Sequence, residues 1–292
     1  MRVFGSRWAT LNVSATATAE AFNPIGSNQL GSGCVKPWML PNCDPVTTHT
    51  SSPENTLCAG GPYATFVNPT TGAPSNPGLA PAGVKGELLI LKPGNPSAAS
   101  APSQYYPLDV PEGPSPSLCP PGAATGSGGA SLYERNIECC STAWLSCGVQ
   151  TAQPETGNMV GPTRHGVDLL IHESANGSGQ DTLNSSTLAI TGGANNPNPA
   201  LVGKTVTSSS SVCTVPIYDG TQLCSGKSCG STVNIVGFMQ IFVKDETNPQ
   251  GTVEAYVLNV GGCGNSTAGG GTPGGTSGGN PSFIPVRLVQ NP

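Results

Sequence analysis

Charged residues are scarce in this 292-residue chain, at 9% of the total against about 25% in a typical soluble domain. There is no run of lysine or arginine and the net charge is −5, so the electrostatic footprint of a nucleic-acid-binding protein is missing. No apolar stretch approaches the ~20 residues that span a bilayer, and none follows Met1 as a signal peptide would require. These absences argue against nucleic-acid binding and against a membrane span within the chain.

Glycine and proline are abundant, with 40 and 29 residues, about twice their usual share. Glycine raises the entropy cost of ordering the backbone, and proline removes a donor and breaks helices. Long helices are therefore excluded. We predict a mainly β fold, an antiparallel sheet with long irregular, disulfide-braced loops and two or three short helices.

Eleven cysteines indicate an oxidising compartment, and their odd number leaves one thiol without a partner in the chain. Structural zinc sites pair two tight Cys-x₂₋₄-Cys motifs, but Cys224 and Cys229 have no matching second pair. We therefore favour disulfides over zinc, with the pairing left open. The disulfide candidates lie in three groups: Cys34 and Cys43; Cys139, Cys140 and Cys147; Cys213, Cys224 and Cys229.

Apolar runs bounded by turn residues predict the ordered elements of one β-rich domain over residues 1–292. The run 86–92 indicates a buried strand, 131–138 a short helix, and 159–173 the main helix, opened by Pro162. Residues 232–244 and 252–260 predict an antiparallel hairpin around a turn cluster.

The rest of the domain is expected to be less regular. Residues 25–83 are interpreted as an irregular cysteine-containing loop region and 112–212 as a helical and loop insertion. The C-terminal sheet is assigned to 230–292, with a glycine-rich loop over 261–280. A final strand over 282–290 is expected to rejoin the hairpin.

One polar group on the predicted helix has the spacing of a metal site. His165, Asp168 and His172 stand at i, i+3 and i+7, so they share one helix face. Two imidazoles and a carboxylate are suitable ligands for a transition metal. The simpler alternative, which we favour, is a polar stripe facing solvent, so no metal and no cofactor is predicted.

The segment Gly226–Gly230 matches the G-x-S-x-G pattern of a serine nucleophile, with Ser228 at its centre. That mechanism requires a strand, a sharp turn and then a helix. A strand-like sequence follows Gly230 instead, so the match is treated as coincidental. No catalytic residue is predicted and the protein is expected not to be an enzyme.

Several longer segments, taken together and in this order, resemble the Flp (tight-adherence) pilus-assembly proteins of the TadE/G-like type. The segments are VSATATAEAFNPIGSN (13–28), CVKPWMLPNCDP (34–45), LKPGNPSAASAPSQYYPLDVP (91–111), GNMVGPTRHGVDLLI (157–171), VNIVGFMQIFVK (233–244) and IPVRLVQ (284–290).

The resemblance implies a non-enzymatic structural or assembly protein of the cell envelope, periplasmic or extracellular. Its partners would be other pilus or envelope proteins. It would reach a membrane only through an N-terminal helix that the relatives carry upstream of the corresponding segment. The alternative is a secreted β-rich adhesin or carbohydrate-binding module, which Tyr105, Tyr106 and Trp144 would support if they gathered on an exposed sheet face.

We predict that Cys34 and Cys43 form a disulfide with each other. They lie nine positions apart across a loop that Pro37 and Pro41 stiffen. Closing so short a loop stabilises a fold by roughly 2–3 kcal/mol in the chain-entropy account. Peptide mapping without reductant should recover the two cysteines in one linked pair. Free thiols at both positions, or pairing of each with a distant cysteine, would contradict this.

Overall fold

The computed structural model describes most of the chain between residues 31 and 263. The described ranges are 31–32, 35–45, 64–68, 71–95, 97–98, 101–110, 119–139, 145–151, 153–155, 159–225, 228–248 and 251–263. The expected final strand over 282–290 and most of the glycine-rich loop lie outside these ranges.

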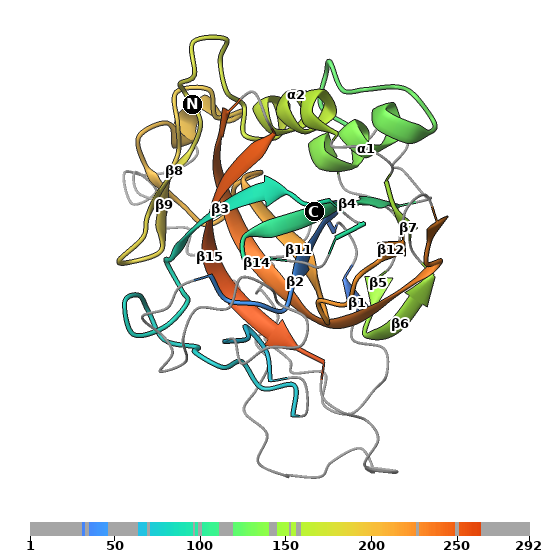
Figure 1. The fold of residues 1–292 in the computed structure, drawn as a ribbon. Helices are drawn as coiled ribbons and strands as arrows, with labels where there is room; N and C mark the ends of the chain where they lie inside the picture. The colour runs from blue at the N-terminus through green and yellow to red at the C-terminus, as the bar shows by residue number, and fades with distance from the viewer. Residues whose placement is uncertain are drawn as a thin grey trace, which may run out of the picture.

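The centre of the fold is a sheet of six strands that closes on itself (Figure 1), because β11 pairs with both β2 and β14. In order around the closed sheet the strands are β11 (Val212–Tyr218), β2 (Trp38–Pro41), β4 (Gln104–Asp109), β3 (Leu88–Pro93), β15 (Thr252–Gly262) and β14 (Thr232–Asn248). The protein is therefore mainly β, as its composition predicts.

The sheet is mixed, with two parallel pairings beside the expected antiparallel ones. β2 runs parallel to β11, and β3 runs parallel to β4, whereas the other four pairings are antiparallel. Only β14 and β15 are joined by a tight turn, which forces antiparallel pairing. The remaining strands are joined by longer segments, which leave the direction of pairing to the tertiary packing.

The hairpin and both helices are confirmed, with shifted ends. β14 and β15 pair antiparallel over ten positions, and β14 extends four residues beyond the predicted end. The short helix is α1 (Gly129–Glu138) and the main helix is α2 (Val160–Leu170). α2 ends before Glu173 because His172 adopts a positive φ of 57°, which an α-helix cannot accommodate.

The two helices lie side by side across one end of the closed sheet (Figure 1). They approach each other closely at Gly166 of α2, where a Cβ atom would lie 2.8 Å from Cβ of Ile137 on α1. A glycine in a helix interior costs about 1 kcal/mol relative to alanine. Here the close contact between the helices explains the residue.

The interior of the closed sheet is the main apolar core. Alternate residues of each strand point inward, such as Leu89 and Leu91 on β3, while their neighbours point outward. Burying a Leu, Val or Ile side chain fully contributes about 1.5–3 kcal/mol. The buried inward-facing strand residues are Trp38, Leu40, Leu89, Leu91, Tyr105, Cys213, Val215, Ile217, Met239, Ile241, Val243, Val253, Ala255, Val257 and Val260.

Smaller strands cover parts of the outer surface of the closed sheet. A three-stranded sheet packs through Ile190 and Val206 against Phe242 of β14. The peripheral elements are β1 (Gly31–Ser32), β5 (Leu145–Ser146), β6 (Gly148–Thr151), β7 (Gln153–Pro154), β8 (Thr182–Asn184), β9 (Ala189–Thr191), a 3-10 helix (Pro199–Leu201), β10 (Thr205–Val206), β12 (Cys224–Ser225) and β13 (Ser228–Cys229).

The N-terminal half contributes more to the core than its irregular sequence predicts. β2 lies within the expected loop region 25–83, yet its four residues are buried and form one wall of the closed sheet. Phe66, Val67 and Val84 from the same region are also buried in the core. β11, which carries Pro216 in its interior, was not predicted as a strand. In the described part of the chain, no helix is long and apolar enough to cross a membrane.

A buried chain of hydrogen bonds joins the sheet to both helices. The Trp38 indole N–H donates to the Tyr133 hydroxyl over 3.0 Å, and that hydroxyl lies 3.0 Å from the Thr163 hydroxyl. The Tyr105 hydroxyl lies 3.4 Å from Thr163 and donates to the Gly251 carbonyl over 2.8 Å. Burial raises the pKa of both tyrosines, so they stay neutral and act as hydrogen-bonding groups.

We predict that Tyr133→Phe lowers the free energy of unfolding by about 1–3 kcal/mol, because it leaves the buried Trp38 N–H and Thr163 hydroxyl without their shared partner. Urea denaturation followed by circular dichroism would measure the change. Tyr256→Phe is the matched control, since that hydroxyl makes no hydrogen bond within the described chain, and it should change stability by less than about 0.5 kcal/mol. Equal effects of the two changes would contradict the network's structural role.

Candidate functional site

The closed sheet has an opening beside the first residue of β4. β4 begins at Gln104, which pairs with Lys92 near the end of β3. Its other neighbour, β2, pairs with it only at Trp38 and Met39. No described strand therefore fills the space between residues 40–45 on one side and 88–91 on the other.

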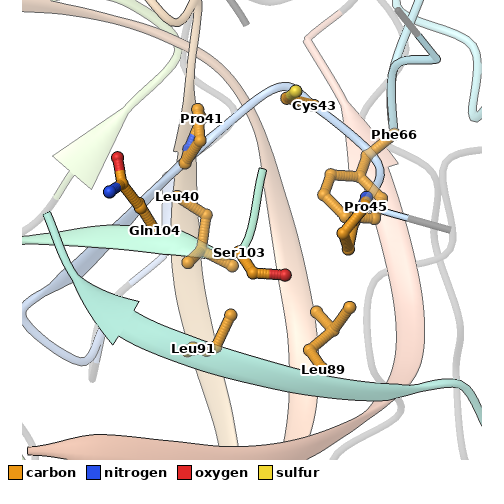
Figure 2. Close-up of a pocket in the computed structure, with 9 residues that line it drawn as sticks. All are labelled: Leu40, Pro41, Cys43, Pro45, Phe66, Leu89, Leu91, Ser103 and Gln104. Atoms are coloured by element: carbon orange, nitrogen blue, oxygen red, sulfur yellow. The ribbon is translucent and has the colours of Figure 1, made fainter. Parts of the chain in front are cut away.

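A small apolar pocket occupies this opening (Figure 2). Its enclosed volume is only about 10 Å³, room for about one water-sized sphere, whereas small-molecule sites begin at roughly 300 Å³. The pocket is therefore an apolar depression that is too small to enclose a cofactor. The lining residues are Leu40, Pro41, Cys43, Pro45, Phe66, Leu89, Leu91, Ser103 and Gln104.

The strand beside the pocket, β3, presents two exposed apolar side chains on its outer face. Leu88 is 38% and Ile90 45% exposed, whereas Leu89 and Leu91 between and after them are buried. The continuous apolar run predicted a strand buried on both faces, and the exposure of Leu88 and Ile90 corrects this. Because every residue in a run of leucine and isoleucine is apolar, the sequence does not show whether one face of the strand is buried or both.

The backbone of β3 is paired on one side only at these residues. Val257 N–H donates to the Glu87 carbonyl over 2.9 Å, and antiparallel hydrogen-bonded pairs recur at every second residue. Leu89 and Leu91 therefore bond to β15, while the N–H and C=O groups of Leu88 and Ile90 point away from it. No strand in the described ranges receives those groups. At Lys92 the same side is paired again, through its N–H to the Ser103 carbonyl at 2.8 Å.

Two buried carboxyl groups lie at the start of this region. Glu87 alternates with Leu89 and Leu91 and is 6% exposed, and Asp44 follows the pocket residue Cys43 and is also 6% exposed. Desolvation by burial, together with the charge of Asp44, raises the pKa of Glu87 to about 8. Glu87 is thus largely protonated at neutral pH.

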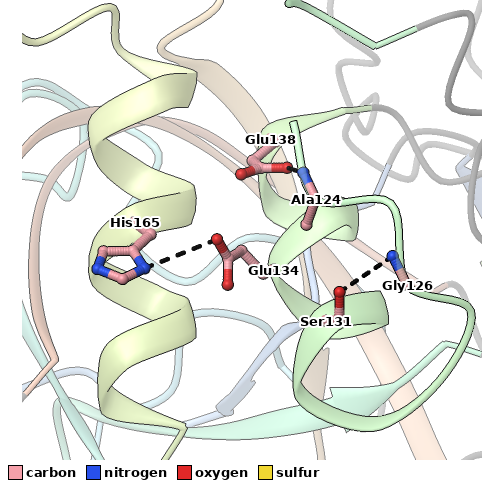
Figure 3. A network of polar contacts seen from close by, with 6 residues as sticks. All are labelled: Ala124, Gly126, Ser131, Glu134, Glu138 and His165. Atoms are coloured by element: carbon pink, nitrogen blue, oxygen red, sulfur yellow. Dashed lines mark hydrogen bonds and ion pairs between the residues drawn. The ribbon is translucent and has the colours of Figure 1, made fainter. Parts of the chain in front are cut away.

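The predicted metal candidates do not converge, which corrects that alternative. His165 is 69% exposed and faces Glu134 of α1 at 3.8 Å (Figure 3), whereas His172 lies beyond the end of α2. Because the helix stops at Leu170, the predicted shared face does not reach His172. Burial raises the pKa of Asp168, and Arg164 and His165 lower it. Among the described residues, no three His, Cys, Asp or Glu side chains are grouped as metal ligands.

The polar contacts around α1 have structural roles (Figure 3). The Glu138 carboxylate accepts from the Ala124 N–H at 2.7 Å, and the Ser131 hydroxyl accepts from the Gly126 N–H at 3.1 Å. These bonds hold the loop before α1 against the helix, so the carboxylate and the hydroxyl are already engaged with backbone.

Ser228, the centre of the G-x-S-x-G match, lies in a two-stranded hairpin. It begins β13 and pairs with Ser225 of β12. A serine nucleophile of that type needs a strand-to-helix turn. The next long element after Ser228 is the strand β14. The strand-like sequence after Gly230 therefore forms a strand, and the helix that the nucleophile pattern requires is missing there.

The disulfide bonds link residues that are far apart in the sequence. Cys119 bonds to Cys139 at the end of α1, and Cys147 bonds to Cys263 across 116 positions of the sequence. Cys43 and Cys224 are each in a disulfide as well. Cys34 and Cys140 lie outside the described residues, so the predicted Cys34–Cys43 pair stays a prediction. Cys119 and Cys263 were not among the candidates because each stands alone in the sequence.

Cys213, predicted as a disulfide candidate, is a free and buried thiol. It lies on β11 and faces the core, where no second thiol meets it among the described residues. Burial raises its pKa to about 11, so the nucleophilic thiolate is not populated at neutral pH.

Lys36 is a buried lysine, a kind of group often found at functional sites, and it was not identified from the sequence. Burial lowers the pKa of its ammonium group, and the Cys213 and Glu138 groups nearby raise it. The Lys36 Nζ donates to the carbonyls of Ile137 and Cys139, both at 2.6 Å. These are among the last carbonyls of α1, which a helix leaves without internal partners. Lys36 therefore caps α1.

The aromatic candidates do not form an exposed platform. Tyr105 and Tyr106 are 0% and 1% exposed, because β4 is covered on both faces, and Trp144 lies outside the described residues.

No family model matches the chain, and searches of curated proteins and of solved structures find no similar protein.

We predict that Glu87→Gln changes how stability depends on pH. The unfolded carboxyl loses its proton near pH 4.5 and the folded one near pH 8, so the parent loses stability as pH rises between these values. The glutamine variant lacks this loss and should gain stability relative to the parent across that window. Denaturation curves at pH 4, 6 and 8 would measure it.

The control for this experiment is Asp109→Asn, which removes the same charge from an exposed residue at the end of β4. Its stability relative to the parent should change less between pH 4 and 8. Parallel profiles for the parent and Glu87→Gln would show that Glu87 is not held protonated in the folded state.

Proposed function

We propose that this chain is a non-enzymatic structural or assembly protein of the cell envelope, related to Flp (tight-adherence) pilus biogenesis. The observation that carries the proposal is where the segments of the resemblance meet. Trp38, Tyr105 and Thr163 come from three of those segments, and they are joined through Tyr133 in one buried network. The resemblance therefore concerns residues that hold the fold together.

The roles of the titratable groups support a non-enzymatic function. Lys36 caps α1, and Tyr105 and Tyr133 bond to other buried groups. None of these three lines the pocket beside β3. These three buried groups are engaged with the protein itself.

The disulfides support placement outside the cytoplasm. Bonds such as Cys147–Cys263 form and persist in oxidising compartments, whereas cytosolic thiols are kept reduced. Within that setting we place the protein in the periplasm or at the cell exterior, among other pilus or envelope proteins.

Deletion of the gene from a bacterium that carries a tight-adherence locus is the test. We expect loss or sharp reduction of pili, counted by electron microscopy, and restoration by the parent gene. A gene encoding Ser228→Ala should restore pili equally well, because Ser228 has no role in this proposal. Normal piliation after deletion would overturn the proposed function, and failure of Ser228→Ala alone, at normal protein level, would overturn its non-enzymatic character.

A further inference from the structure

The open side of β3 has the geometry of a strand-addition site. The N–H and C=O groups of Leu88 and Ile90 point away from β15, in the direction from which another strand would pair. At Lys92 that direction is taken by Ser103, so the unpaired stretch covers Leu88 to Leu91. Peptides that add to a sheet edge use such backbone groups for affinity and side-chain pockets for specificity.

The same stretch combines an exposed apolar surface with an apolar pocket. Leu88 and Ile90 expose their side chains on the outer face, and the pocket lined by Leu40, Phe66 and Leu89 opens beside the strand (Figure 2). An exposed apolar strand with an unpaired edge promotes association with other chains unless something covers it. The occupant should therefore be an extended segment whose side chains include an aliphatic row.

We propose that this edge binds residues 282–290 of the same chain, SFIPVRLVQ. In an extended segment alternate residues share a face, which places Ile284, Val286 and Leu288 together. That row is wholly aliphatic and suits the apolar lining on the inner face of the sheet, beside Leu89 and Leu91. Pro285 lacks an N–H, which an outermost strand tolerates because one of its sides stays unpaired.

The segment between Cys263 and Ser282 is long enough for residues 282–290 to reach β3. The last described residue, Cys263, lies seven positions beyond Tyr256, which is opposite Leu88, so about 23 Å of strand separates them. From Cys263 to Ser282 is 19 residues, and a glycine-rich chain of that length has a root-mean-square span of about 24 Å. Attachment at this distance gives an effective concentration in the millimolar range, which favours the chain's own segment over that of a second copy.

Hydrogen exchange of the β3 amides tests the proposal directly. The full chain is compared with a chain that ends at Asn280, which keeps every residue of the described core. We expect the Leu88 and Ile90 amides to exchange at least about 10-fold faster without the segment, because they lose their partners. The Leu89 and Leu91 amides, which bond to β15, are internal controls and should change little. Equal exchange at Leu88 and Ile90 in the two chains would overturn the proposal.

A full-length variant keeps the test usable if the shortened chain does not fold. Val286→Asp combined with Leu288→Asp places two charges on the aliphatic row and leaves the described residues intact. It should raise exchange at Leu88 and Ile90 as the truncation does. Unchanged protection in this variant would count against the proposal.

A binding experiment identifies the occupant. A labelled peptide of residues 282–292 is titrated against the shortened chain and followed by fluorescence anisotropy. Ile90→Lys should weaken binding at least 10-fold, whereas Val149→Lys, at a 69% exposed position on the edge strand β6, should not. Absence of peptide binding, or equal effects of the two lysines, would contradict the assignment to β3. Protection of Leu88 and Ile90 that depends on protein concentration, with dimers in ultracentrifugation, would assign the segment to a second copy and overturn binding within one chain.

Discussion

The closure of the sheet through β11 is the constraint on which the rest of the structure depends. β11 pairs with β14 along its whole length and with β2 at its end, and this second pairing joins the two ends of the strand order. A chain with 9% charged residues and 69 glycines and prolines has few long apolar elements from which to build a layered core. Closing six strands around one interior lets residues from distant segments share the same core.

Closure leaves one end of the interior to be covered, and the two helices do so. Tyr133 of α1 and Thr163 of α2 are buried against the sheet and need partners, since an unsatisfied buried polar group costs about 1–3 kcal/mol. The chain Trp38–Tyr133–Thr163–Tyr105 supplies partners between the sheet and both helices, and Lys36 supplies them for the end of α1. The same bonds also fix the position of the helices, because hydrogen bonds are directional and apolar contacts are not.

The irregular segments are secured to this centre by covalent bonds and by polar contacts. Cys119–Cys139 holds the segment before α1, and Cys147–Cys263 joins the region of β6 to the end of β15. The one part of the closed sheet that the described residues leave incomplete is beside β3, where β4 starts too late to fill the wall. Among the described residues, the unpaired edge of β3 is apolar, which suits the pairing of a polypeptide strand better than chemistry on a small molecule.

Much of the local structure was predictable from the sequence, because it depends on neighbouring residues. The hairpin of β14 and β15, the strand β3 and both helices follow from apolar periodicity and turn residues, and the high glycine and proline content excluded long helices. Tertiary structure alone decided the closure of the sheet, the parallel pairings and the place of β2 and β11, because those strands are short and their partners are remote. It also decided that α2 stops before His172, that Cys213 stays a thiol while Cys119 and Cys263 do not, and that Leu88 and Ile90 face outward. Each of these depends on which distant groups meet in space, and a single sequence holds no local signal for that.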